Sequence, residues 1–198
     1  MPEAVVALTG ASGARYGVRL VEALRAADWI VRLIVTNEGA INLDLECAIS
    51  PEQLAERTGA ILERDDDLAA KSASGSSRWS ACIVCPASGT TIGRIACGIS
   101  ENLVSRSAIV AMKERRGLIL VPREAPYATV HLENMTKLSK LGVVIIPASP
   151  GFYHQPESID DLVDFIVQRI LDQLGIDNDL TRRWTGEEIG DDGSMSQP

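Results

Sequence analysis

Hydrophobic residues fall into two patterns along the chain, short continuous runs and longer segments in which they recur every three or four positions. The short runs are rich in Val, Ile and Leu and barely alternate with polar residues, as parallel strands covered on both faces do. We expect strands at 4–8, 30–36, 81–85, 118–121 and 143–146. We expect helices at 13–27, 51–58, 90–98, 101–115, 129–141 and 158–174. Alternation of the two patterns predicts βαβ units and an open parallel α/β sheet with helices on both faces.

The last predicted helix has the clearest boundaries. Ser158 and Asp161 form a start like a capping box, and Gly175 stands where a helix commonly ends. The polar segment 65–80 is expected to be a mobile loop. We therefore expect one domain over residues 1–185 and an acidic, disordered tail over 186–198.

Charge and cysteine usage narrow the class of protein. The formal net charge of −8 argues against a nucleic-acid or anionic-membrane surface. No secretory signal and no apolar run of about 20 residues is evident, which predicts a cytoplasmic protein. Cys82 and Cys85 form a C-x-x-C pair, but positions three apart in a strand face opposite sides. We interpret them as buried thiols rather than a zinc or redox site.

The stretch "LTGASGARYG" at 8–17 follows a strand and precedes a helix, an arrangement suited to binding phosphate. It lacks the dinucleotide fingerprint, because Ser12 stands where G-x-G-x-x-G needs its second glycine. The next strand ends in Thr36 and Asn37, without the acid that usually binds a ribose. Nicotinamide dinucleotides are therefore disfavoured, and a mononucleotide such as FMN fits better.

A second loop of the same kind follows the third predicted strand. Ser88, Gly89, Thr90 and Thr91 offer hydroxyl groups and close backbone approach at a helix start. Two such loops at the carboxyl ends of neighbouring strands predict a ligand in the crevice of the sheet.

Several longer stretches carry a resemblance to a known family. "PASGTTIGRIACGISENLVSRSA", "MKERRGLILVPREAPY" and "GVVIIPASPGFYHQPESIDDLVDFIVQRILDQLGI", with the glycine turn, resemble the UbiX-type flavin prenyltransferases over about residues 4–184. The resemblance implies a flavodoxin-like fold and a dodecamer built from trimers. It also implies transfer of a dimethylallyl group from dimethylallyl phosphate to N5 and C6 of reduced FMN, without a metal. The prenylated FMN serves UbiD-type decarboxylases.

The resemblance also assigns residues. It places FMN against Gly10, Ala11, Ser12, Thr36, Ser88, Gly89, Thr90, Thr91, Arg106 and Arg123. It places the prenyl phosphate against Lys113, Tyr153 and Arg169, some of them from a neighbouring subunit. Ser12, Lys113 and Glu124 are the implied catalytic residues, with Glu124 assisting proton transfer; Glu46 and Trp184 also match family positions. Gly89 stands where relatives often carry Met.

Two other functions remain open. A flavin-dependent cysteine decarboxylase would have a similar second loop, but it uses an Asn where this chain has Thr90 and an early catalytic His, whereas the first His here is His131. A non-catalytic FMN-binding protein would keep both loops without needing Lys113, Glu124, Tyr153 and Arg169 together.

Overall fold

The computed structural model describes residues 1–184 of the 198-residue chain. The tail predicted at 186–198 lies outside the described residues. Within the described part, one six-stranded sheet carries the fold, and all of its strand pairs are parallel. The prediction of an open parallel sheet is therefore confirmed.

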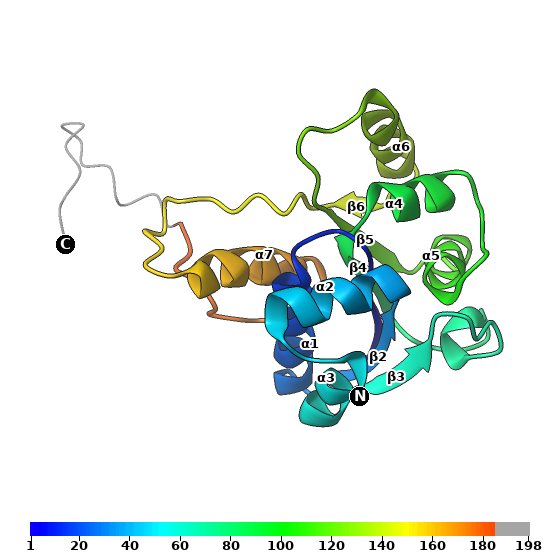
Figure 1. Cartoon of the computed structure of the whole chain (residues 1–198), viewed down its shortest axis with the longest axis horizontal. Helices are drawn as coiled ribbons and strands as arrows, with labels where there is room; N and C mark the ends of the chain where they lie inside the picture. The colour runs from blue at the N-terminus through cyan, green and yellow to red at the C-terminus, as the bar shows by residue number, and fades with distance from the viewer. Residues whose placement is uncertain (185–198) are drawn as a thin grey trace.

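The strands lie in the order β3-β2-β1-β4-β5-β6 (Figure 1). They are β1 (Glu3–Leu8), β2 (Ile30–Val35), β3 (Ile61–Arg64), β4 (Ala81–Ala87), β5 (Gly117–Pro122) and β6 (Val144–Ile145). The five predicted strands alone follow the flavodoxin-like order 2-1-3-4-5, and β3 extends it to the doubly wound order 3-2-1-4-5-6. The order reverses between β1 and β4, so the loops after these strands diverge and leave a crevice there.

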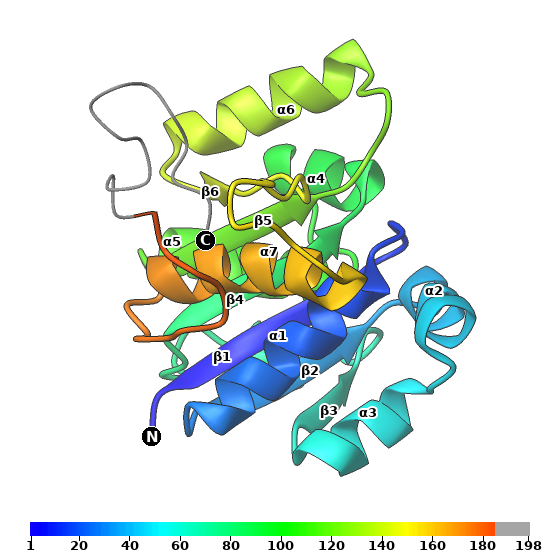
Figure 2. The same ribbon diagram turned by 90° about the vertical axis from the view of Figure 1, so that its left-hand side faces the viewer.

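Helices cover both faces of the sheet, and Figure 2 shows α1 and α7 in front of the strands with α4 and α5 behind. They are α1 (Ala14–Ala26), α2 (Asn37–Cys47), α3 (Pro51–Thr58), α4 (Gly89–Ala96), α5 (Leu103–Lys113), α6 (Thr129–Lys140) and α7 (Ile159–Gln173). One core cluster joins the sheet to α1, α2, α3 and α7, and a second joins it to α4, α5 and α6. Strands buried between two such cores explain the continuous apolar runs. Among residues 1–184, no helix combines the length and apolar character needed to cross a bilayer.

The sequence patterns missed α2 and β3. Helix α2 buries Leu43 but exposes Ile41 and Leu45, so its apolar residues do not mark one face. Strand β3 is a four-residue edge strand in which the buried position is Glu63, paired with Arg32 of β2. A charged residue facing inward removes the apolar signal of a strand.

Strand β4 continues through Pro86 to Ala87, two residues beyond the predicted end at position 85. The register with β5 shifts between Val84 and Ala87, and Ala87 pairs with Pro122. An irregularity of this kind tolerates proline because the ladder needs no donor there. Cys82 and Cys85 lie in opposite core clusters, as predicted, and burial raises the pKa of Cys82 to about 12.

The polar segment 65–80 is packed against α5 rather than projecting as a loose loop. It contains a short 3₁₀ turn, η1 (Lys71–Ala73), whose Ser72 and Ala73 are buried. The Ser107 hydroxyl donates to the Ser72 carbonyl at 3.3 Å, and Arg116 donates to the Gly75 carbonyl at 2.6 Å. The segment that suggested mobility is thus held by hydrogen bonds to its backbone carbonyl groups.

Candidate functional site

The loops after β1, β4 and β5 are joined by hydrogen bonds at the carboxyl edge of the sheet. The hydroxyl of Thr9, a buried residue, donates to the Pro86 carbonyl at 2.8 Å and accepts from the Ser88 amide at 2.8 Å. The Arg123 guanidinium donates to the Ser12 carbonyl at 3.1 Å. The structure therefore brings together Ser12, Ser88 and Arg123, which the resemblance assigned to FMN. Thr9 was missed, although a lone polar residue at the end of an apolar strand could have indicated it.

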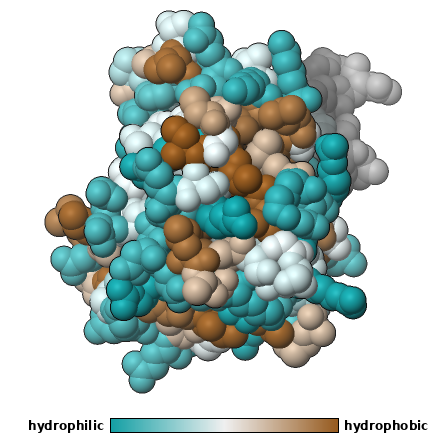
Figure 3. Space-filling model, turned by 90° about the vertical axis from the view of Figure 1, so that its right-hand side faces the viewer, coloured by the Kyte–Doolittle hydropathy of each residue, from teal (hydrophilic) through white to brown (hydrophobic). Residues whose placement is uncertain are grey.

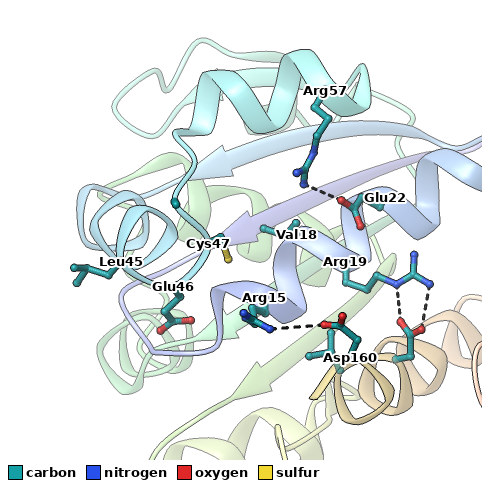
Figure 4. Close-up of a pocket in the computed structure, with 12 residues that line it drawn as sticks. Arg15, Val18, Arg19, Glu22, Leu45, Glu46, Cys47, Arg57 and Asp160 are labelled. Carbon is teal, nitrogen blue, oxygen red and sulfur yellow. Dashed lines mark hydrogen bonds and ion pairs between the residues drawn. The ribbon is translucent and has the colours of Figure 1, made fainter. Parts of the chain in front are cut away.

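Glu46 occupies the amino end of α1, which the sequence pattern had suggested for a phosphate (Figure 4). Its carboxylate accepts from the Gly13 amide at 2.9 and 3.1 Å and from the Ala14 amide at 2.7 Å. Helix amino ends favour negative charge. A carboxylate from α2 thus satisfies the donors that a phosphate would use, and the expectation of phosphate at this helix end is not supported.

A cleft of about 490 Å³ lies beside this end of α1, between the loops after β1, β2 and β4. Its lining residues are Gly10, Thr36, Asn37, Glu38, Asp65, Ser88, Thr90, Thr91, Arg94, Glu101 and Asn102. The Ser88 hydroxyl caps α4 by accepting from the Thr91 amide at 3.2 Å. The helix start, the hydroxyl groups and Arg94 form a donor set suited to a phosphate.

Gly10 lets the chain run close to α2 at this cleft. A Cβ on Gly10 would lie 2.7 Å from the Glu38 Cβ, so a side chain would collide with the helix. The close backbone approach and the hydroxyl-rich lining fit the phosphate end of FMN.

The cleft continues past Thr36 into an acidic hollow of about 630 Å³ over β2 and β3. Glu52, Asp65, Asp66 and Glu101 line this hollow. Asp65 and Glu101 also line the cleft, where Glu101 pairs with Arg94 at 3.8 Å.

Gly89 faces His131 of α6 across a close helix contact. A Cβ on Gly89 would lie 2.5 Å from His131 Nε2, and the Nδ1 of that ring is buried without a hydrogen-bond partner. His131 therefore takes the space that a side chain at position 89 would need. This contact accounts for the glycine where relatives often carry Met.

Glu124 follows β5 and is exposed at the same edge of the sheet as Ser12. The pKa of the neighbouring Tyr127 is raised, first by burial and then by the negative charge of Glu124. Glu124 is thus a solvent-accessible carboxylate next to Arg123, which holds the loop of Ser12.

Tyr153 and Arg169 lie together in a separate pocket of about 220 Å³ on the outer side of α7. Phe165, Gln168, Arg182, Arg183 and Trp184 complete its lining. The Tyr153 ring meets those of Phe165 and Trp184 edge to face, with centroids 5.7 and 5.9 Å away. Arginines beside an aromatic wall suit a phosphate attached to a short apolar chain.

Within one protomer, this pocket is apart from the cleft. Arg169 is ten residues along α7 from its start at Ile159, roughly 15 Å at the rise of an α-helix. The α7 start lies beside the α1 start, since Arg15 and Asp160 pair at 3.7 Å. None of the described cavities is lined by residues of both sets.

Lys113 and Arg106 also lie away from the cleft. Lys113 ends α5 just before β5 begins, so it sits at the amino edge of the sheet, where it pairs with Glu114. Arg106 donates to the Ala73 carbonyl at 3.0 Å and does not line the cleft. The structure of one protomer therefore assembles the predicted FMN loops but not the full set of predicted residues.

A larger cavity of about 810 Å³ lies between α1, α2, α3 and α7 (Figure 4). Several of its charges pair with one another: Arg15 with Asp160, Arg19 with Asp164 at 2.5 Å, and Arg57 with Glu22 at 2.7 Å. These ion pairs join the helices, and they leave few unpaired charged side chains in the cavity to bind a ligand.

Comparison with known proteins identifies the family. The flavoprotein family model matches residues 2–171. The flavin prenyltransferase UbiX of Pseudomonas aeruginosa is 45% identical over 96% of this chain and 98% of its own. The flavin prenyltransferase LpdB of Lactiplantibacillus plantarum is 45% identical over 94% of this chain and 100% of its own.

Solved structures agree. AnUbiX (PadA1) in complex with FMN and dimethylallyl pyrophosphate superposes with a TM-score of 0.91 at 37% identity, covering 94% of this chain and 99% of its own. A dodecameric FMN-dependent UbiX-like decarboxylase from Escherichia coli O157:H7 superposes with a TM-score of 0.90 at 40% identity, covering 93% of this chain and 100% of its own. The cysteine decarboxylase TvaF, at 0.61 and 19% identity over 73% of this chain and 89% of its own, shares only the fold. The chain belongs to the flavoprotein family and, within it, to the UbiX flavin prenyltransferases.

Proposed function

We propose that this chain transfers a dimethylallyl group from dimethylallyl phosphate to reduced FMN held at the carboxyl edge of its sheet. The interlocked loops after β1, β4 and β5 carry this proposal, because Thr9 and Arg123 fix Ser12 and Ser88 around one crevice. FMN, when bound, supplies the nucleophilic ring positions that accept the prenyl group.

The phosphate end of FMN is proposed to bind in the 490 Å³ cleft, against Gly10, Thr36, Ser88, Thr90 and Thr91. Ala11 and Gly89 complete the two loops, and Arg123 holds the first loop from β5. Arg106 remains a less supported member of this set, since its guanidinium is used by the Ala73 carbonyl.

The donor needs groups that take up charge as its phosphate leaves. Tyr153 and Arg169 are proposed to hold that phosphate, because cationic and hydroxyl donors stabilise developing oxyanion charge. Glu124 is proposed to accept the proton released when the flavin ring system is restored. Its exposure lets it return that proton to solvent.

We propose that the complete site forms between subunits. Lys113 lies at the opposite edge of the sheet from Ser12, and the Tyr153 pocket lies on the far part of α7. Exposed hydrophobic residues could bury at such contacts: Val130, Leu132 and Leu141 are 54%, 49% and 56% exposed. Figure 3 shows hydrophobic patches on the side that faces right in Figure 1, the side on which α4, α5 and α6 lie. A homo-oligomer, in keeping with the dodecameric relative, would bring the separate parts together.

The product is proposed to serve a UbiD-type decarboxylase, as the resemblance implies. The cytoplasm is the proposed compartment. The four cysteines, Cys47, Cys82, Cys85 and Cys97, are all free thiols, as expected in a reducing environment.

The activity is tested by anaerobic incubation with reduced FMN and dimethylallyl monophosphate, followed by mass measurement of the extracted flavin. The expected product is heavier than FMN by one five-carbon prenyl unit. Glu124→Gln should lower turnover while FMN and donor affinities stay near wild type. Tight FMN binding without any mass change would contradict the proposal and favour a non-catalytic flavin-binding protein.

Sharing of sites between subunits is tested by mixing two impaired variants. Lys113→Ala and Glu124→Gln should each have strongly lowered activity alone, and dissociated and reassembled mixtures should regain part of the wild-type activity. Mixtures that stay as low as the single variants would show that both residues act within one subunit.

A further inference from the structure

The segment that follows α7 folds back to close the Arg169 pocket. We call residues 174–184 the strap. Thr181 hydrogen bonds to Gln168 of α7, and the Asn178 amide donates to Asp172 of α7 at 3.3 Å. Arg182, Arg183 and Trp184, at the end of the strap, then line the pocket together with Arg169. The strap thus supplies two of the three guanidinium groups of the pocket.

Asp172 joins the strap to the helix through two arginines at once. Its carboxylate accepts from Arg183 at 2.7 and 3.2 Å and from Arg169 at 2.9 Å. The Asp172 side chain is only 17% exposed, whereas those of Arg169 and Arg183 are 51% and 50% exposed. The carboxylate is therefore set behind the guanidinium groups, which keep about half of their surface open to an incoming anion.

The hydrogen bond from Arg183 holds the pKa of Asp172 below its usual value, although burial opposes the shift. Asp172 therefore stays negative at neutral pH. Asp172 raises the pKa of Arg183 most, and the negative charge of Asp177 raises it further by a smaller amount. The pocket combines three arginines with one fixed carboxylate between two of them.

We propose that Arg183 is a further ligand of the donor phosphate, and that Asp172 biases the pocket toward a phosphate monoester over a diphosphate. A monoester carries nearly two negative charges at neutral pH, and a diphosphate carries about one more. A fixed negative charge beside the binding groups penalises that additional charge. Lys113 from a neighbouring subunit would attract both donors and leave the effect of Asp172 in place. This inference rests on the proposed function, which places the donor here.

Calorimetric titration of the full-length protein tests it, with inorganic phosphate and pyrophosphate as probes at pH 8 and constant ionic strength. FMN is present throughout, so that the cleft is filled. Arg183→Gln should weaken phosphate binding about tenfold, the loss of one charge-assisted hydrogen bond. Asp172→Asn should raise the ratio of pyrophosphate to phosphate affinity about threefold to fivefold, the effect of one charge roughly 5 Å away in water.

Arg57→Gln is the matched control, because Arg57 also is 50% exposed and pairs with a carboxylate, Glu22. It should leave both affinities unchanged. Arg183→Lys and Asp172→Glu keep the charges and should restore most of the affinity and of the ratio. The inference fails if Arg183→Gln behaves like the control, or if Asp172→Asn lowers both affinities equally, as it would if it only detached the strap.

The probes contain no prenyl group, so the outcome is independent of catalysis. Phosphate binding that depends on Arg183, without any prenylated flavin, would refute the proposed function and leave the pocket assignment intact. Prenylated flavin formed at the wild-type rate by Arg183→Gln, with unchanged phosphate affinity, would refute the pocket assignment alone.

Discussion

The contact of Glu46 with the start of α1 makes a quantitative prediction. The Gly13 and Ala14 amides, which have no partner inside the helix, both donate to this one carboxylate. Hydrogen bonds to a charged group contribute about 1.5–3 kcal/mol each when buried, and these are partly buried. We therefore expect Glu46→Ala to lower the free energy of unfolding by about 2–3 kcal/mol. Glu46→Gln keeps one acceptor oxygen and loses the charge, so we expect about 1 kcal/mol.

The assay is urea unfolding at one fixed protein concentration, since subunit association adds to apparent stability. Thermal unfolding should show a corresponding fall of about 4–12 °C for Glu46→Ala, at the 2–4 °C per kcal/mol expected for a chain of this size. Glu52→Gln is the control, because Glu52 also lies in the first turn of a helix, α3, but is exposed and bonded only to Ser50. It should cost less than about 0.5 kcal/mol.

Two results would refute this reasoning. Glu46→Ala within about 0.5 kcal/mol of wild type would mean that water satisfies the helix end equally well. Weaker FMN binding by Glu46→Gln, with an unchanged free energy of unfolding, would mean that the carboxylate acts on the ligand and not on the helix.

Two further predictions concern packing and pH. Gly89→Ala should destabilise the protein by about 1–3 kcal/mol through overpacking against His131. Adding His131→Ala to the same chain should recover most of that stability. If Gly89→Ala costs as much in the His131→Ala background as in the wild-type background, the contact is excluded. Burial acts to raise the pKa of Glu3, but hydrogen bonds from Lys71 and Arg32 outweigh it and lower that pKa below its usual 4.5. The stabilisation from ionised Glu3 is then complete above about pH 4.5 and is lost as the pH falls through the lowered pKa. Urea unfolding from pH 7 to 3 should therefore show a steeper acid decline for wild type than for Glu3→Gln, and parallel curves would count against it.

The sequence by itself determined the α/β class, five of the six strands and the two glycine and hydroxyl loops. These features follow from local causes: continuous apolar runs mark strands buried on both faces, and Ser158 with Asp161 marks a helix start. It also carried the family, because the motifs around Lys113, Arg123 and Tyr153 are specific as strings of residues. Helix α2 and strand β3 escaped because tertiary contacts, and not periodicity, hold Leu43 and Glu63 in place.

Only the tertiary structure decided which groups meet. The sequence pattern suggested phosphate at the start of α1, but Glu46, 33 residues beyond Gly13, occupies that position. Likewise, Arg169 and Arg183 share Asp172 only because the strap turns back over α7. Lys113, grouped by resemblance with Arg169, lies at the far edge of the sheet because α5 runs antiparallel to the strands that it covers. Side chains brought together by chain reversal and crossover leave no pattern at short range, so their partners can be read only from the folded molecule.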